Sequence, residues 1–154
     1  MIKKEENFIN CKTCNKNKLV SEFRKHKTNK SRLDYTCKRC RTEQNMHNQC
    51  FTTRGRSNRI FCDCQKACRK NGWKINIDIN WIESKIKNKY CEATGIEFVI
   101  SKKNPWMPSI DRINPRLGYT KENCQMVVWI YNTAKQEFTH EDVIKLSKAI
   151  LKNE

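Results

Sequence analysis

The sequence predicts an α+β protein in which a small cysteine-bearing module precedes a domain of one β-hairpin with flanking helices. Four cysteines near the N-terminus stand in two close pairs. The stretch 109–135 holds two short apolar runs around a turn rich in Pro, Gly and Asn, and the second run leads into a helix-forming segment. Other stretches carry apolar residues at helical spacing. A chain of 154 residues suffices for one ordinary domain with such an appendage.

The charge of the chain is strongly positive and uneven. The formal net charge is +16; residues 1–70 carry 19 Lys and Arg against 6 Asp and Glu, and residues 71–154 carry 13 against 10. Because Lys and Arg release condensed counterions from phosphates, such a basic half is typical of nucleic-acid binders. A solubility charge or a membrane-surface patch is the alternative. No membrane-spanning apolar run or signal peptide is visible, so we expect a cytoplasmic protein without a membrane partner.

The two cysteine pairs follow the pattern C-x2-C-x22-C-x2-C. Two tight turns that each supply two thiolates can converge tetrahedrally on one Zn²⁺, and without a secretion signal disulfides are not expected. Four thiolates leave no open coordination position, so the zinc would be structural and would stabilise a module too small to build its own core. The expected zinc ligands are Cys11, Cys14, Cys37 and Cys40.

Basic side chains mix with aromatic ones between the two cysteine pairs. Phe23 and Tyr35 lie among them, and this mixture suits contact with a nucleic-acid backbone, although the two rings could equally pack over the zinc site. The residues expected to contact nucleic acid are Arg24, Lys25, Lys27, Lys30, Arg32, Lys38, Arg39, Arg41, Arg54, Arg56 and Arg116.

Three segments follow from these patterns: a zinc module over 1–42, a basic helical connector over 43–72 and a hairpin-bearing domain over 73–154. The connector is expected to break near 52–55 and to end at Gly72, a residue type favoured at helix C-termini.

The last domain is expected to start with an extended stretch over 73–80 and a helix over 80–90. Asn80 and Glu83 have capping-box spacing, and a turn and a strand should follow over 91–100. The helical face should carry Ile82, Ile86 and Tyr90, and a final helix capped by Thr139 should carry an apolar stripe of Val143, Leu146, Ile150 and Leu151.

The other cysteines leave two readings open. Cys64 and Cys68 stand one helical turn apart, with Cys62 beside them, and could share a metal with Cys50 or Cys91. More often such cysteines are small buried apolar side chains, and Cys124 is expected to be one.

The stretch 108–123 reads P-S-I-D-R-I-N-P-x-x-G-Y-T-x-x-N, and Asn132 and Lys135 follow in an N-x-x-K arrangement. This set resembles the HNH endonucleases of phages and bacteria, also called His-Me finger or ββα-metal nucleases. Several of them also begin with a cysteine module, and one restriction enzyme of the family is similar in having an Asp-Arg pair. The resemblance is good over 91–138 and weak over 43–80.

The resemblance implies a role for three residues. Asp111 and Asn132 match the two protein ligands of a catalytic divalent cation, and two oxygen ligands with room for water suit Mg²⁺ or Mn²⁺. Asn123 matches the asparagine that holds the hairpin loop by hydrogen bonds.

One departure affects the chemistry. Arg112 stands where the family has its general base, a histidine, and an arginine stays protonated and cannot accept a proton from water. It can instead hold a phosphate oxygen and stabilise charge in the transition state. If the enzyme is active, another group or a metal-bound water must supply the base. Among the groups, Glu83 and Tyr90 are the first candidates, followed by Tyr119, His26, His47 and His140.

A second departure concerns zinc. Many relatives carry a second zinc site, bound by one C-x2-C before the hairpin and another at the final helix, and three of those four cysteines are absent here. We therefore expect one zinc per chain, with a core of Val128, Trp129 and Tyr131 in place of the second metal.

The predicted function is a metal-dependent HNH endonuclease that hydrolyses DNA phosphodiester bonds, of the homing, restriction or recombination type. A catalytically inactive zinc-bearing regulator that binds DNA or RNA is the alternative. The wealth of Lys, Asn and Ile fits a phage or mobile-element origin, and hence a host cell cytoplasm. The expected partner is double-stranded DNA; because cutting both strands with one active site usually needs a dimer, a homodimer is also considered.

Overall fold

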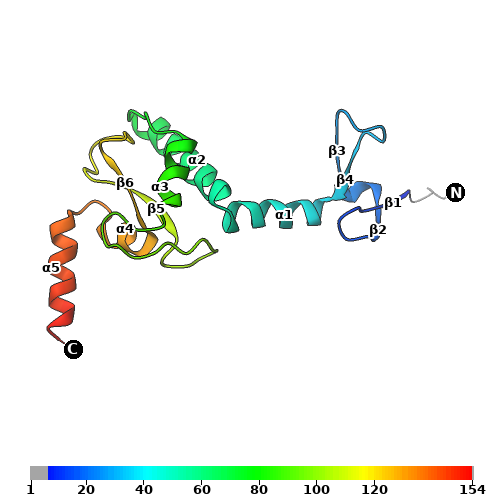
Figure 1. The fold of residues 1–154 in the computed structure, drawn as a ribbon. Coiled ribbons are helices and arrows are strands. Elements are labelled where there is room, and N and C mark those ends of the chain that lie inside the picture. The colour runs from blue at the N-terminus through cyan, green and yellow to red at the C-terminus, as the bar shows by residue number, and fades with distance from the viewer. Residues whose placement is uncertain (1–6, 154) are drawn as a thin grey trace. The chain divides into compact units, whose positions relative to one another are not determined.

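A computed structural model describes residues 7–153, and they form an α+β protein whose three small sheets are antiparallel strand pairs (Figure 1). The chain divides into two compact units, Met1–His47 and Asn48–Glu154. Within the described range, no helix has the length and apolar character needed to cross a membrane.

The first unit is built around its cysteines. β1 (Phe8–Asn10) pairs with β2 (Asn17–Leu19), and β3 (Phe23–Lys25) pairs with β4 (Leu33–Cys37) after a short 3-10 turn, Val20–Glu22. The ring of Phe23 is 4% exposed and packs in the cysteine cluster, whereas Tyr35 is 44% exposed with the Lys12 ammonium 4.4 Å from its ring centroid. Of the two aromatic rings, only Tyr35 is therefore free to meet a ligand.

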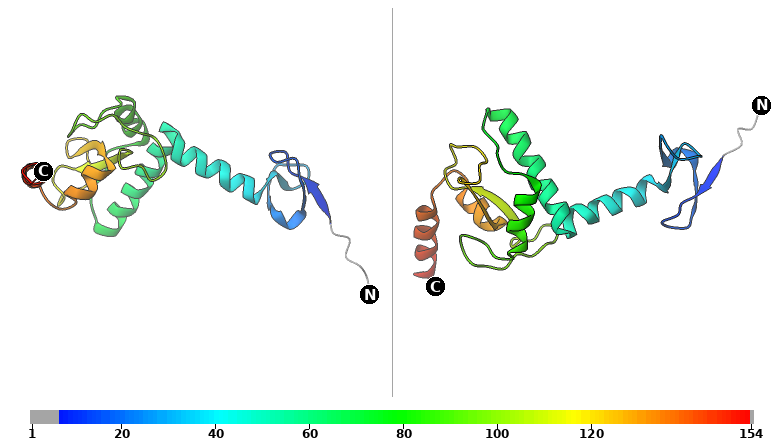
Figure 2. Two further views of the ribbon diagram at one scale, coloured as in Figure 1. Left: turned by 90° about the horizontal axis from the view of Figure 1, so that it is seen from below. Right: turned by 45° about the horizontal axis from the view of Figure 1, so that its top comes forward.

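The predicted connector is two helices with a break between them. α1 (Lys38–Phe51) ends just before Thr52, whose side chain accepts a hydrogen bond from the Gly55 N–H and caps α2 (Thr53–Asn71). α2 ends at Gly72, which adopts the left-handed conformation at φ 67° that favours glycine. These two features confirm the expected break and end. α2 packs along the helix α3 (Ile79–Lys87) and belongs to the second unit, so the two compact units differ from the expected three segments (Figures 1 and 2).

The start of α3 corrects the expected cap. Asp78, not Asn80, is the N-cap residue, and its carboxylate accepts a hydrogen bond from the Trp81 N–H at 2.9 Å. Ile82 and Ile86 are buried as expected, but Tyr90 lies beyond the helix and is 56% exposed. The expected strand over 91–100 is reduced to a bridge between Tyr90 and Glu97. The core between α2, α3 and the hairpin consists of Ile60, Cys64, Ile77, Ile82, Ile86 and Met126.

The hairpin and its helix form the centre of the second unit. β5 (Pro108–Arg112) pairs with β6 (Cys124–Val128) in a register that sets Asp111 opposite Gln125. α4 (Trp129–Lys135) follows β6 directly. The final helix, α5 (His140–Leu151), begins with a capping box between Thr139 and Asp142. Of the residues expected to form the apolar stripe of α5, Val143 packs against the core and Leu146, Ile150 and Leu151 are exposed.

A small core cluster forms around Cys91, where the sequence predicts apolar packing in place of a second metal. Cys91 packs there with Val127, Val128 and Tyr131. Trp129 does not join them, because its side chain is 42% exposed, which corrects the expectation that it fills this core.

Candidate active site

A cleft of about 710 Å³ lies where β5, α4 and the loop between the two hairpin strands meet. Asp111 and Arg112 line it from β5, and Asn132 lines it from α4. Three of the four residues that the sequence marked as catalytic thus share one cleft. The other lining residues are Trp73, Ile110, Pro115, Tyr119, Thr133, Gln136 and Glu137.

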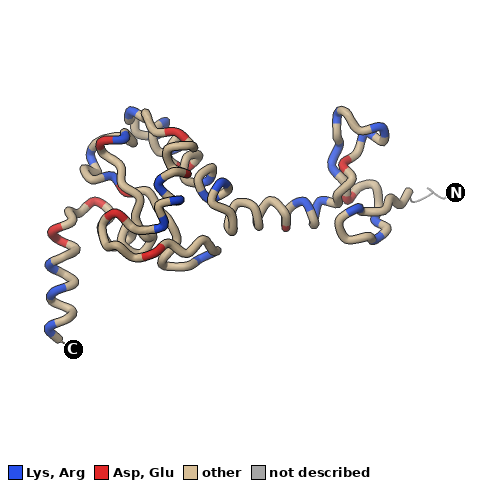
Figure 3. Tube along the Cα trace, in the orientation of Figure 1, with Lys and Arg blue, Asp and Glu red and all other residues tan. Residues whose placement is uncertain are grey.

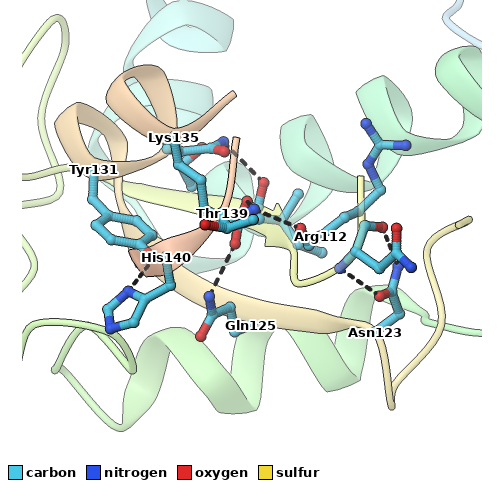
Figure 4. Close-up of polar contacts among 12 residues, drawn as sticks. Arg112, Asn123, Gln125, Tyr131, Lys135, Thr139 and His140 are labelled. Atoms are coloured by element: carbon cyan, nitrogen blue, oxygen red, sulfur yellow. Dashed lines mark hydrogen bonds and ion pairs between the residues drawn. The ribbon is translucent and has the colours of Figure 1, made fainter. Parts of the chain in front are cut away.

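Asp111 is held between two neighbours at the bottom of this cleft. Its carboxylate is 3% exposed; Oδ1 accepts a hydrogen bond from Lys135 Nζ at 3.1 Å, and Oδ2 accepts one from Gln125 Nε2 at 2.9 Å (Figure 4). Lys135 is 1% exposed and also donates to the Arg112 carbonyl at 2.9 Å. Because a carboxylate offers about four lone-pair sites, two of them remain available on Asp111 for a further ligand.

Asn132 is oriented by hydrogen bonds from its amide nitrogen. Nδ2 donates to Ser109 Oγ at 2.8 Å and to the Ile110 carbonyl at 3.0 Å. A carbonyl can only accept, so the contact with Ile110 identifies which amide atom is the nitrogen. The amide oxygen is then left as a ligand in a cleft that also contains the Asp111 carboxylate. One carboxylate and one amide oxygen form a donor set that fits a hard divalent cation such as Mg²⁺ or Mn²⁺.

Arg112 is fixed against two aromatic rings. Its guanidinium carbon lies 4.0 Å from the ring centroid of Trp73 and 5.2 Å from that of Tyr119, and Nη1 donates to the Leu117 carbonyl at 3.1 Å. Cation–π contacts of this kind hold a guanidinium in place while its remaining N–H groups stay available. The result is a permanent positive charge in the wall of the cleft.

Asn123 holds the loop between β5 and β6. Its Oδ1 accepts a hydrogen bond from the Asn114 N–H at 2.9 Å, and Nδ2 donates to the carbonyls of Gly118 and Asn114 at 2.9 and 3.1 Å (Figure 4). These contacts tie the start and the middle of the loop to a side chain at its end. The side chain is 7% exposed and does not line the cleft, so its geometry is that of a supporting residue.

Gly118 is the residue of this loop that tolerates no side chain. A Cβ there would lie 2.1 Å from the carbonyl oxygen of Lys74, and the Tyr119 N–H donates to the same carbonyl at 2.9 Å. We expect Gly118→Ala to lower the free energy of unfolding by about 1–3 kcal/mol, because backbone on both sides must move. Urea denaturation checks this. Leu117→Ala, at a side chain that is 53% exposed, should unfold with a free energy close to that of the wild type. Equal stability of the two variants would contradict the close contact between Gly118 and the Lys74 carbonyl.

The two first candidates for the base lie outside the cleft. The carboxylate of Glu83 pairs with Arg54 at 2.7 Å and with Lys87 at 3.0 Å, and these cations hold its pKa below the usual value. Tyr90 follows the C-terminal end of α3, is exposed, and does not line the cleft. Of the further candidates, Tyr119 lines the cleft, and burial raises its pKa to about 12. His140 instead hydrogen-bonds the Tyr131 hydroxyl at 2.8 Å.

The contacts that four residues make around Asp111 or in the cleft were not predicted from the sequence. Lys135 was visible as part of the N-x-x-K pattern, and Gln125 would follow from Asp111 once the hairpin register is known. Trp73 and Glu137 reach the cleft through tertiary packing, and no local pattern marks them.

The four N-terminal cysteines form a second candidate site, for a metal with soft ligands. The sulfur atoms of Cys11, Cys14, Cys37 and Cys40 all lie within 4.8 Å of one another. The Cys37 N–H donates to Cys11 Sγ at 3.3 Å, and backbone N–H groups lower the pKa of Cys11 to about 6. Hydrogen bonds with the neighbouring cysteines, together with burial, raise the pKa of Cys40 to about 12. Zn²⁺ fits this donor set.

The remaining cysteines have the features of core residues. Burial raises the pKa of the Cys64 thiol well above its usual value and that of Cys124 to about 12. Cys68 is buried beside them, Cys50 is half-buried and Cys62 is exposed. Within residues 7–153, the four N-terminal cysteines are the one group of three or more His, Cys, Asp or Glu side chains close enough together to hold a metal.

Several of the basic residues expected to bind nucleic acid have partners within the fold. Arg41 forms a bidentate ion pair with Asp34, Arg54 pairs with Glu83, and Arg39 pairs with Glu43 at 2.9 Å. Lys and Arg gather in the β3–β4 turn and at the start of α1 (Figure 3). The exposed basic side chains from the expected set include Arg24, Lys25, Lys27, Lys30, Arg32, Lys38 and Arg116.

Comparisons with known proteins add a distant similarity. No family model matches the chain, and no curated protein matches it either. A solved structure of PacI, described as a rare-cutting HNH restriction endonuclease, is similar over 93% of this chain and 93% of its own, with 19% sequence identity and a TM-score of 0.42. Because that similarity is distant, the function of this chain rests on the residues of the cleft.

Proposed function

We propose that this chain is a metal-dependent endonuclease of the HNH, ββα-metal type, which hydrolyses DNA phosphodiester bonds. One observation carries the proposal. Asp111 and Asn132, which come from a hairpin strand and from the helix behind it, line one cleft together with the fixed cation of Arg112. A site for hydrolysis of a phosphodiester needs this combination: oxygen ligands for a divalent cation and a positive group for the phosphate.

Each group in the cleft has a role in this proposal. Mg²⁺ or Mn²⁺, held by Asp111 and Asn132, would supply positive charge to the reacting phosphate and to the departing 3′ oxygen. Arg112 donates its free N–H groups to a non-bridging phosphate oxygen and stabilises the charge that develops there. Lys135 holds the Asp111 carboxylate in position through their ion pair at 3.1 Å.

Glu137 is the best remaining candidate for the base. Of the lining residues that could accept a proton, Asp111 is engaged by Lys135 and Gln125, and the pKa of Tyr119 is about 12. Glu137 is exposed and lines the cleft, and across residues 7–153 no ion pair to its carboxylate is found. The preceding Gln136 has φ 43° and ψ −107°, a backbone conformation that side-chain-bearing residues rarely adopt and that is often associated with functional sites.

The reaction then balances as a hydrolysis. A water molecule gives a proton to the Glu137 carboxylate as its oxygen bonds to phosphorus. The bond from phosphorus to the 3′ oxygen breaks, and that oxygen takes a proton from solvent. The products are a 5′ phosphate and a 3′ hydroxyl, and Glu137 returns its proton to solvent.

The role of Glu137 predicts a large kinetic effect. Glu137→Gln should lower the single-turnover rate of DNA cleavage by about 10²–10⁴-fold, because general-base catalysis contributes about that much, and should leave DNA affinity nearly unchanged. Glu141→Gln, at an exposed carboxylate of α5 outside the cleft, is the matched control. Cleavage by Glu137→Gln at the wild-type rate would exclude Glu137 as the base.

The first unit supports this proposal as a DNA-binding module. Zn²⁺ on the four cysteines would be structural, and the exposed basic residues around Tyr35 would contact phosphates, as would those of α1. Contacts between basic side chains and phosphates carry no information about the base sequence, so this module would supply affinity for DNA and would not select the target sequence.

An inactive nucleic-acid-binding regulator is the second candidate. It is favoured by the buried ion pair between Asp111 and Lys135, which satisfies part of the carboxylate without a metal, and by an arginine at the position of the family base. The retention of both oxygen ligands in one cleft favours the enzyme.

Plasmid cleavage separates the two candidates. Zinc-loaded protein is incubated with supercoiled plasmid in Mg²⁺, in Mn²⁺ and in EDTA, beside Asp111→Ala and Asn132→Ala. The nuclease proposal predicts nicked or linear DNA with Mg²⁺ or Mn²⁺ only, and loss of cutting in both variants. Cutting that survives in folded Asp111→Ala would show that the cleft is not the nuclease site.

A further inference from the structure

A second hollow adjoins the proposed active site on the side of α2. Its volume is about 340 Å³, at the small end of the range for ligand pockets. Ile110, Tyr119 and Asn132 line both this hollow and the main cleft. A strand whose phosphate reacts beside Asn132 would therefore have this hollow as its nearest neighbouring space.

The α2 wall of the hollow carries two arginines at i, i+3 spacing. Arg56 is anchored, because Nε and Nη2 both donate to the Pro108 carbonyl at 2.9 and 2.6 Å. Arg59 uses only Nε, which pairs with Asp63 at 2.9 Å, so its two terminal nitrogens remain available. The Arg59 side chain is 56% exposed. Arg59 is thus the group in this wall that can bind an anion, and Arg56 is a rigid positive neighbour.

The α4 part of the lining carries an exposed aromatic ring. Trp129 is the first residue of α4, and its backbone N–H donates to the Met107 carbonyl at 2.8 Å, which fixes its position. A tryptophan that is 42% exposed leaves a large apolar surface in water. An arginine and a tryptophan that line one small hollow suit a nucleotide, because the arginine can bind phosphate and the ring can pack against base or sugar.

We propose that this hollow binds the nucleotide next to the cleaved phosphate on the same strand, with its phosphate on Arg59 and its sugar and base against Trp129. This inference rests on the proposed nuclease function. The alternative is that Arg59 only forms an i, i+4 ion pair with Asp63 on the surface of α2. Exposed pairs of this kind contribute little to stability.

The test of Arg59 uses a matched control on the same helix. Lys66 also pairs with Asp63, at 3.4 Å, and is 66% exposed, but it does not line the hollow. Affinity for duplex DNA is measured by fluorescence anisotropy in EDTA over a series of salt concentrations. Arg59→Ala should weaken binding about tenfold. It should also reduce the slope of log K against log salt by about 0.9, as expected for one lost phosphate contact. Lys66→Ala should do neither.

The test of Trp129 follows the same logic. Trp129→Ala should raise KM for a cleaved DNA about tenfold, because one packed base or sugar is lost, while Trp129→Phe should retain most of the affinity. Trp106→Ala, at a tryptophan that is 39% exposed and lies outside the hollow, is the control. If Arg59→Ala also lowers stability, Arg59→Gln provides a second variant that keeps the length and polarity of the side chain.

The outcomes separate this inference from the nuclease proposal. If the wild type cuts DNA and Arg59→Ala has the affinity and salt slope of Lys66→Ala, the nucleotide site is wrong and the nuclease stands. If the wild type cuts no DNA, the nuclease proposal is wrong, and so is the proposal of a site for the nucleotide next to the cleaved phosphate. The nucleotide site is supported if the wild type cuts DNA, if Arg59→Ala binds DNA about tenfold more weakly, if Trp129→Ala has a KM about tenfold higher, and if the control variants change neither quantity.

Discussion

Removal of zinc is expected to unfold the first unit and to leave the second unit folded. The buried core of the first unit consists of Phe23 and three of the zinc-ligand candidates, Cys11, Cys37 and Cys40, so little apolar surface remains to hold it together without the metal. Structural zinc contributes about 10–16 kcal/mol in comparable small modules. Amide NMR spectra recorded during titration with a chelator should lose the dispersed signals of residues 7–47 first.

Two cysteine variants give this prediction its control. Cys37→Ser removes a buried ligand candidate and should reproduce the effect of the chelator, whereas Cys62→Ser, at an exposed cysteine of α2, should not. DNA affinity should fall with the first variant because the basic residues of the module lose their arrangement. Dispersed signals that persist in metal-free protein would show that the module folds without zinc.

Replacement of Lys135 by methionine is expected to destabilise the second unit strongly. The side chains of Lys135 and Asp111 are 2% and 3% exposed and pair at 3.1 Å, so the substitution leaves a buried carboxylate without its cation. Breaking such a pair from one side costs about 3–5 kcal/mol. Urea denaturation of Lys135→Met measures the loss.

The double variant Asp111→Asn with Lys135→Met separates stability from chemistry. Replacing both charged partners should recover most of the lost free energy of unfolding, since no buried charge is left unpaired. Cleavage should remain absent, because a neutral amide replaces the carboxylate that would bind the metal. A double variant as unstable as Lys135→Met would contradict the ion-pair explanation.

Some elements were predictable because their determinants are local. The cysteine spacing predicts the module, and its four sulfurs do converge. Thr139 with Asp142 forms the cap of α5, and Gly72 ends α2, because each depends only on residues within one turn. The order of the hairpin and α4 followed from two apolar runs around a turn.

Other features depend on packing that the local sequence does not encode. Asp78 and Asn80 both have side chains that can cap a helix, and the position of Ile77 and Ile82 in the core decides in favour of Asp78. Trp129 was expected in the core in place of a second metal. It instead lies exposed and lines a hollow together with Arg56 and Arg59 of α2, which are 70 residues or more away in sequence. Trp73 and Glu137 enter the cleft from segments outside the hairpin, so only the folded chain brings them to Arg112.

Cleavage of a random-sequence DNA library in Mg²⁺ by the wild type and by the double variant at positions 111 and 135 decides whether the cleft around Asp111 is a nuclease site. A library contains any short target, so the result does not depend on knowing which sequence is cut. We expect new 5′-phosphate ends with the wild type, no such ends in EDTA, and none with the folded double variant. A folded, DNA-binding wild type that leaves the library intact would contradict it, and would identify the chain as a binding protein with an inactive cleft.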